Sequence, residues 1–175
     1  MRIVYKVAVF THLGMSVMRG KLLQRKGFLT AGSAIFVASL IAAAQAATPV
    51  ETQKARHEHY EELGKAFKAV RDGMNASTPD FAALQKNAEI VNEASVDQPQ
   101  WFPKGTGPEA GKTRALPEIW TKPADFEAAQ KMLSDRAPKL LAAVKSKDVD
   151  AVKAAFKETG GACKNCHDTF RSPEE

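Results

Sequence analysis

The sequence predicts an all-α protein that folds as an antiparallel up-down-up-down four-helix bundle. Four segments after residue 46 repeat apolar residues at steps of three and four, the spacing of one face of an α-helix. No segment shows the period-two alternation of a strand. The first and last connections are short, which favours antiparallel neighbouring helices. About 129 residues follow residue 46, and this length suits one domain.

Residues 1–46 have the composition of an export signal. Basic residues at positions 19–26 precede an uncharged, mostly apolar stretch over 28–44, and Ala44-Gln45-Ala46 fits the small-x-small cleavage rule. We therefore expect a cleaved signal peptide over residues 1–46 and a mature domain over 47–175, exported to the periplasm. An uncleaved membrane anchor is the alternative, although this run is short for a bilayer span. With no second apolar run, the mature form is predicted not to be embedded in the membrane.

The charge of the mature domain argues against nucleic-acid binding. Residues 1–46 hold six of the 25 Lys and Arg residues and none of the 20 Asp and Glu residues. The mature domain therefore has a net charge near −1 rather than the +5 of the whole chain. It carries no cluster of basic residues with interleaved aromatic ones.

The first two predicted helices run from about Val50 to Met74 and from about Pro79 to Val96. The turn between them is rich in stop signals, and Thr78 could cap the second helix with proline at its first position. The stripe expected to face the bundle interior comprises Arg56, Tyr60, Leu63, Phe67, Val70 and Met74, followed by Phe81, Leu84, Ala88 and Val91.

Residues 97–122 form a long irregular segment rich in proline and glycine, which also holds both tryptophans, Trp101 and Trp120. A loop of this length in a small domain is usually functional or disordered. Its many aromatic and apolar residues favour a packed loop, able to shield the edge of a bound cofactor.

The last two helices are predicted from about Pro123 to Ser146 and from the cap Asp148 to about Phe170, with a kink at Pro138. Gly160 and Gly161 lower helix stability, which either reflects close approach of a flat cofactor or is simply tolerated. The interior stripe comprises Phe126, Leu133, Ala137, Leu140 and Val144, followed by Val149, Val152, Phe156, Thr159, Cys163, Cys166 and Phe170.

The last helix ends with C-x-x-C-H, from Cys163 to His167, which is the attachment pattern of a c-type haem. Helical spacing puts both thiols and the imidazole on one face, where the thiols reach the two vinyl groups and the imidazole reaches the iron. One covalent haem c is therefore predicted, with Cys163 and Cys166 as attachment sites and His167 as the iron ligand.

Three other uses of these cysteines fit the sequence less well. A thioredoxin-like C-x-x-C needs a preceding strand, and none is predicted. A structural zinc site needs four ligands, which would require His57 and His59 as a second pair. A disulfide between residues three apart closes a short loop and stabilises little.

Taken together, the mature domain resembles cytochrome c′, the class II c-type cytochromes. Beyond the late C-x-x-C-H, the resemblance rests on three blocks of residues. The first is Arg56 with Tyr60, Leu63-Gly64 and Phe67-Lys68. The second is the pair of loop segments Phe102-Pro103-Lys104-Gly105-Thr106-Gly107 and Arg114-Ala115-Leu116-Pro117-Glu118-Ile119-Trp120, and the third is Cys163 to Arg171. The resemblance implies an exported four-helix bundle, often a homodimer formed through the first two helices.

The resemblance also assigns roles to site residues. It implies that Cys163 and Cys166 form the thioethers, that His167 is the proximal ligand and that Arg171 is a basic residue beside it. Arg171 could equally be a surface residue that favours the helix dipole. Arg56 matches an arginine that pairs with a haem propionate, and a charge on an apolar stripe needs such a partner.

Tyr60 stands where low-spin members have a methionine ligand and high-spin members a non-ligating residue. The resemblance therefore implies five-coordinate, high-spin iron with Tyr60 packed over the distal face. Such a protein binds NO or CO, or transfers single electrons to redox partner proteins. The alternative is a six-coordinate, bis-histidine electron carrier that uses His59. No catalytic constellation is recognisable, so an enzyme is not predicted.

Overall fold

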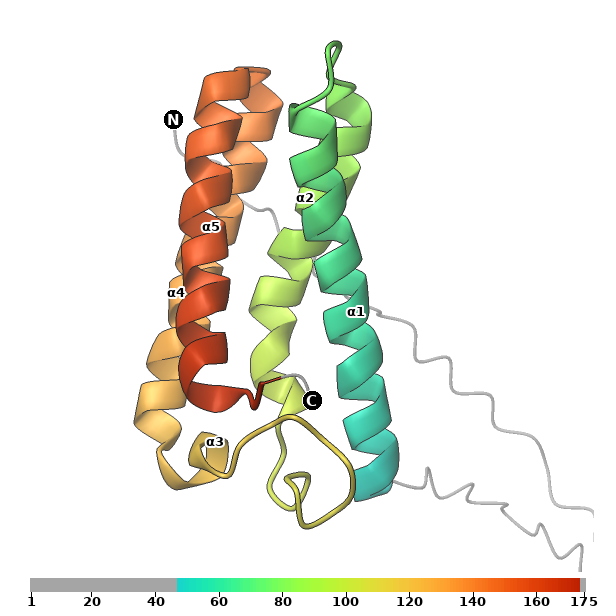
Figure 1. Ribbon diagram of the computed structural model, residues 1–175, viewed down its shortest axis with the longest axis vertical. Helices are drawn as coiled ribbons and strands as arrows, with labels where there is room; N and C mark the ends of the chain where they lie inside the picture. The colour runs from blue at the N-terminus through green and yellow to red at the C-terminus, as the bar shows by residue number, and fades with distance from the viewer. Residues whose placement is uncertain (1–46, 174–175) are drawn as a thin grey trace, which may run out of the picture. The chain divides into compact units, whose positions relative to one another are not determined.

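The computed structural model describes residues 47–173, which form an antiparallel four-helix bundle (Figure 1). Its long helices are α1 (Pro49–Met74), α2 (Phe81–Asp97), α4 (Pro123–Ser146) and α5 (Val149–Phe170). They run alternately up and down, and an isolated bridge is the only β-pairing among the described residues. The predicted fold class is confirmed. The predicted signal peptide lies outside the described residues.

The helix boundaries follow local capping chemistry. Thr48 and Glu51 form a capping box at the start of α1, and Asp148 caps α5 as predicted. The expected cap of α2 is wrong: Asp80, not Thr78, accepts hydrogen bonds from the backbone N–H groups of residues 82 and 83. A carboxylate two residues later is a good N-cap, so the helix begins at residue 81. Helix α4 continues through Pro138, whose ring is exposed.

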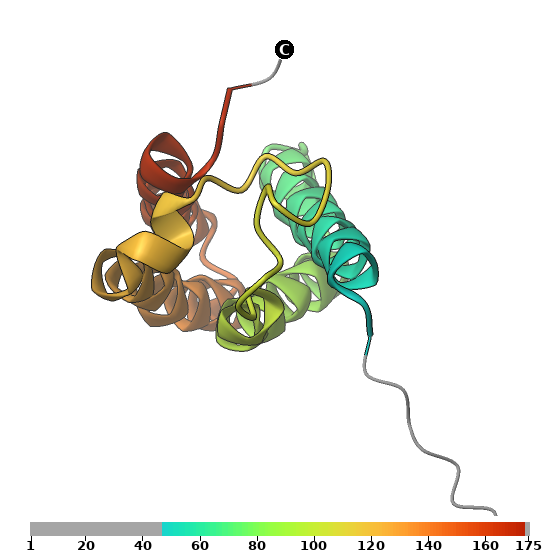
Figure 2. The same ribbon diagram turned by 90° about the horizontal axis from the view of Figure 1, so that it is seen from below.

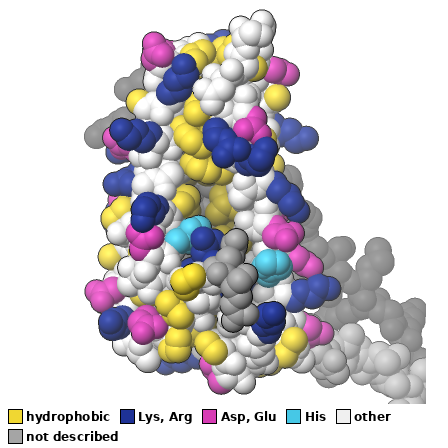
Figure 3. Space-filling model, viewed as in Figure 1, with side chains coloured by type: hydrophobic (Ala, Val, Ile, Leu, Met, Phe, Trp, Pro, Cys, Tyr) yellow, Lys and Arg dark blue, Asp and Glu magenta, His cyan; other side chains and the backbone are white. Residues whose placement is uncertain are grey.

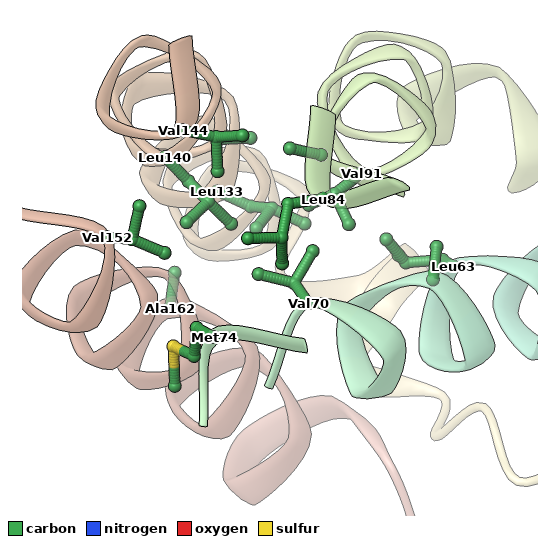
Figure 4. Close-up of a cluster of buried hydrophobic side chains, with 13 residues drawn as sticks. Leu63, Val70, Met74, Leu84, Val91, Leu133, Leu140, Val144, Val152 and Ala162 are labelled. Atoms are coloured by element: carbon green, nitrogen blue, oxygen red, sulfur yellow. The ribbon is translucent and has the colours of Figure 1, made fainter. Parts of the chain in front are cut away.

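One buried cluster fills the bundle at the end away from the long loop (Figure 4). It draws mainly on the C-terminal halves of α1 and α4 and the N-terminal halves of α2 and α5, with Val91, Leu133 and Ala162 just across the middle of their helices. Every residue of the predicted interior stripes is buried or half-buried, so those predictions are confirmed. The cluster comprises Leu63, Ala66, Val70, Met74, Leu84, Ala88, Val91, Leu133, Ala137, Leu140, Val144, Val152 and Ala162.

A second, mainly aromatic cluster lies at the loop end of the bundle. Ile119, Phe126, Ala129 and Phe170 are buried there, and Phe102, Ala115, Trp120 and Cys166 pack against them. The predicted packing of the loop is confirmed. Two short helices within it, η1 (Gln98–Trp101) and α3 (Glu118–Thr121), are not predicted by the sequence because neither is long enough to show a periodic pattern.

The loop crosses the end of the bundle on the side between α1 and α5 (Figure 2). Its far end is joined to α5, because Leu116 N donates to Phe170 O (3.0 Å) and Ser172 N donates to Arg114 O (2.9 Å). Helix α1 packs chiefly on α2, and α5 chiefly on α4. Between α5 and α1, hydrophobic side chains reach the surface of the molecule (Figure 3). Within residues 47–173, no helix combines the length and hydropathy needed to cross a membrane.

Candidate haem site

The C-x-x-C-H motif occupies the last two turns of α5, between the two buried clusters. Cys163 packs against the cluster away from the loop and Cys166 against the aromatic cluster, and both are free, half-buried thiols. Burial raises the pKa of Cys163, and it raises the pKa of Cys166 to about 11 with a contribution from Cys163. Burial and the positive charges of Arg171 and Arg114 lower the pKa of His167. The imidazole is therefore neutral near pH 7, the form that ligates a metal.

The alternative uses of the cysteines find no support in this arrangement. The thiols are not joined in a disulfide. Among the described residues, no three His, Cys, Asp or Glu side chains gather where they could hold a metal ion. The segment preceding the motif is helix rather than strand.

Tyr60 lies on α1 and faces the same part of the interior as the cysteines. Burial raises the pKa of Tyr60 above its ordinary value, and the nearby thiols of Cys166 and Cys163 raise it further. The phenol is therefore neutral at physiological pH. Its ring lies edge-on to Trp101, with centroids 5.0 Å apart, and tilted towards Phe102 at 6.1 Å. Tyr60 thus forms part of an aromatic wall.

Arg56 lies one turn before Tyr60 and is only 4% exposed. Its Nη1 donates to Thr106 Oγ1 (2.9 Å) and Trp101 O (3.2 Å). Its Nη2 donates to Thr106 O (2.8 Å) and Thr113 Oγ1 (3.4 Å). The guanidinium also lies 4.8 Å from the centroid of the Phe102 ring. Loop oxygens thus provide the partners that the buried charge needs.

Arg171 directly follows α5. Burial raises the pKa values of Cys163 and Cys166 and lowers that of His167. The charge of Arg171 has a smaller, lowering effect on all three pKa values, so Arg171 lies near these groups. Its backbone N–H donates to His167 O (3.2 Å), and its side chain is exposed. This position suits both roles predicted for Arg171.

The two histidines of α1 lie on its exposed side. His59 is exposed, and its ring stacks on Trp101 with centroids 4.7 Å apart and planes at 17°. His57 is exposed beside Glu61, with Nε2 3.4 Å from a carboxylate oxygen. Ligation by His59 would require its ring to leave Trp101.

Two buried glutamines that the sequence did not single out complete the site. Gln98 is 3% exposed, and its Oε1 accepts a hydrogen bond from the Tyr60 hydroxyl (3.3 Å). Gln130 is 7% exposed, and its Nε2 has no hydrogen-bond partner among the described residues. Neither glutamine belongs to a motif, and polar residues on an interior face are the only signal that could have indicated them.

These residues fit a covalently bound haem. The chain offers two free thiols and a neutral imidazole on one helical face, aromatic rings around them, and a buried cation. The buried amide nitrogen of Gln130 is a donor without a partner among residues 47–173, which suits a polar group from outside them. A haem supplies an iron that changes oxidation state and binds small ligands. Added Cβ atoms at Gly160 and Gly161 would make only ordinary contacts, so the packing of the chain itself does not require these glycines.

Comparisons with known proteins agree with this chemistry. A family described as Cytochrome C' matches residues 51–171. The cytochrome c' of Alcaligenes xylosoxydans xylosoxydans is 33% identical over 128 residues, covering 73% of this chain and 98% of that protein. Two solved structures of Alcaligenes xylosoxidans cytochrome c prime variants are each 30% identical and cover 74% of this chain and all of theirs. One is a nitric oxide complex (TM-score 0.67) and the other is carbon monoxide-bound (0.66). The chain therefore belongs to the cytochrome c′ family of c-type cytochromes and carries covalently bound haem.

Proposed function

We propose that residues 47–175, after removal of the signal peptide, form a periplasmic cytochrome with one haem, which binds NO or CO and transfers single electrons. Cys163 and Cys166 hold the haem, and His167 is the proximal ligand. The iron is high-spin and five-coordinate, with Tyr60 covering its distal side. Family membership supports the haem chemistry, and the NO- and CO-bound relatives support the choice of ligands.

The observation that carries this proposal is that Tyr60 is a neutral phenol held in place by its neighbours. Its pKa is raised by burial, so it does not offer the phenolate that would ligate iron. Its hydroxyl is engaged by Gln98, and its ring is held by Trp101 and Phe102. A neutral, fixed phenol narrows access to the distal face without closing the sixth position, and this favours small diatomic ligands.

Arg171 and Arg56 have different roles at the proposed haem site. Arg171 lies beside the proximal histidine, where its charge opposes protonation of the imidazole. Arg56 already donates its four terminal N–H groups to the loop. A haem propionate would therefore meet its remaining Nε–H, or replace the long bond to Thr113.

The alternative is a low-spin electron carrier with His59 as a second axial ligand. The stacking of His59 on Trp101 supports the open-site reading instead. Electron transfer with redox partner proteins is compatible with either coordination state. A homodimer through α1 and α2 is compatible with the proposal but not required by it, because the groove between these helices is lined by charged residues as well as by Ala66, Ala69 and Ile90.

The optical spectrum of the purified ferrous protein, recorded before and after addition of CO, tests the proposal. We expect a high-spin spectrum that changes on addition of CO. Tyr60→Met, which introduces a thioether at the distal position, should give a low-spin spectrum, and His59→Ala should leave the wild-type spectrum unchanged. A low-spin spectrum that does not respond to CO, and that becomes high-spin in His59→Ala, would establish the bis-histidine alternative.

A further inference from the structure

Gln98 is a buried side chain at the start of η1, and the two residues that follow it, Pro99 and Gln100, are exposed. It lies where α2 passes into η1, and its amide makes three hydrogen bonds. Nε2 donates to Ser95 O and to Gln130 O, each at 3.3 Å. Oε1 accepts from the Tyr60 hydroxyl, also at 3.3 Å. All the hydrogen-bonding groups of this amide thus face α1, α2 or α4.

These partners determine the direction of the bond to Tyr60. A backbone carbonyl only accepts, so the two carbonyls of Ser95 and Gln130 must face the NH₂ end of the amide. The oxygen of Gln98 then faces Tyr60, and the phenol must be the donor. The reverse amide orientation would set its oxygen against two carbonyl oxygens, which is repulsive. The proton of Tyr60 is therefore directed at Gln98.

We infer that Gln98 is a positioning residue that engages the hydroxyl proton of Tyr60, so that Tyr60 acts on a distal ligand by bulk and not as a hydrogen-bond donor. This inference rests on the proposed function, in which Tyr60 covers the iron. Two consequences follow. Tyr60 must break the bond to Gln98 before its ring turns aside to admit a ligand. A bound diatomic molecule receives no proton from the phenol while that bond is intact.

The same 3₁₀ helix, η1, supplies two of the contacts that hold Tyr60. Gln98 at its start accepts from the hydroxyl, and Trp101 at its end meets the ring edge-on. Trp101 is itself tied to α1, because its carbonyl accepts from Arg56 Nη1 (3.2 Å). The position of Tyr60 therefore depends on η1, which the chain reaches about forty residues later.

The test compares Gln98→Met, Tyr60→Phe and the double variant in the haem-bound protein. Methionine has a similar length but no comparable acceptor. The rate of CO association after flash photolysis should rise about two- to tenfold in each single variant, as expected for loss of one hydrogen bond. The double variant should show no further rise. Ser95→Ala is the matched control, since it removes a buried hydroxyl but leaves the backbone acceptor of Gln98, and its rate should equal that of wild type.

A second readout does not depend on gas binding. Tyr60 is the only tyrosine in residues 47–175, so the tyrosine doublet in the UV resonance Raman spectrum reports its hydrogen bond alone. Gln98→Met should shift this doublet and Ser95→Ala should not. An unchanged doublet, or equal rate changes from Gln98→Met with and without the Tyr60 hydroxyl, would overturn the inference. If Gln98→Met does not fold, Tyr60→Phe alone removes the same bond, and an unchanged CO rate then overturns it. Failure of wild type to bind CO would refute the proposed function, and the doublet would still decide the role of Gln98.

Discussion

Replacing Arg56 by methionine tests whether this one side chain holds the long loop against the bundle. The shortest of its four bonds, 2.8 Å and 2.9 Å, both reach Thr106. Hydrogen bonds to a charged group contribute about 1.5–3 kcal/mol each. The Phe102 ring, 4.8 Å from the guanidinium, adds about 1 kcal/mol as a cation–π contact. Methionine keeps much of the apolar stem but leaves buried acceptors without donors.

We therefore expect Arg56→Met to lower the free energy of unfolding by about 3–5 kcal/mol. This is a large share of the roughly 5–15 kcal/mol that stabilises a typical domain. Urea unfolding followed by circular dichroism measures the loss. Hydrogen exchange should quicken at the amides of residues 106–113, while the amides of the buried cluster at the other end of the bundle stay protected. Arg56→Lys should recover only part of the loss, because an ammonium cannot reproduce the planar fork.

Arg136 offers a matched control on α4. Its Nη1 makes one hydrogen bond, to Glu158 O at 2.8 Å. Arg136→Met should cost about 1 kcal/mol or less, because water replaces the lost bond. If Arg56→Met were within about 0.5 kcal/mol of wild type, or no worse than Arg136→Met, the loop would not depend on Arg56 and the argument would be refuted.

Three further predictions concern the cofactor, the packing and the pH dependence. Alanine at both Cys163 and Cys166 should abolish covalent haem, so that denaturing mass spectrometry gives the mass of the polypeptide alone; haem still attached would contradict the assignment. Gly107→Ala should destabilise the fold by about 1–3 kcal/mol in thermal unfolding, because the added Cβ would lie 2.9 Å from a ring carbon of Trp120. Gly64→Ala is the control: its Cβ would meet nothing within 4 Å, so it should stabilise the fold by up to about 1 kcal/mol. The hydrogen bond from the backbone N–H of Thr48 lowers the pKa of Glu51. Its carboxylate therefore stabilises the fold at any pH above the ordinary pKa of a glutamate, and this contribution is lost as the pH falls through the lowered pKa. Glu51→Gln should therefore lower Tm at pH 7, and the difference from wild type should shrink below about pH 4.

The fold class could be predicted because it depends on local periodicity. Residues at steps of three and four share one helical face whatever lies opposite, so the interior stripes and the helix bounds follow from the chain itself. The same geometry puts Cys163, Cys166 and His167 together on α5, and their identity determines that haem is attached. The predicted N-cap of α2 is two residues too early: Asp80 caps this helix instead of Thr78, because its carboxylate accepts hydrogen bonds from two backbone N–H groups.

The surroundings of Tyr60 could not be predicted in this way. Its partners on η1, Gln98 and Trp101, lie about forty residues further along the chain, and no period or motif relates them to it. For Arg56, the sequence indicated that a buried cation needs a partner, but only the packed loop shows that Thr106 supplies it. By itself, the sequence determined a helical bundle with haem attached to its last helix. Tertiary structure decided how the other wall of the site is held, because contacts between distant segments depend on packing and not on local spacing.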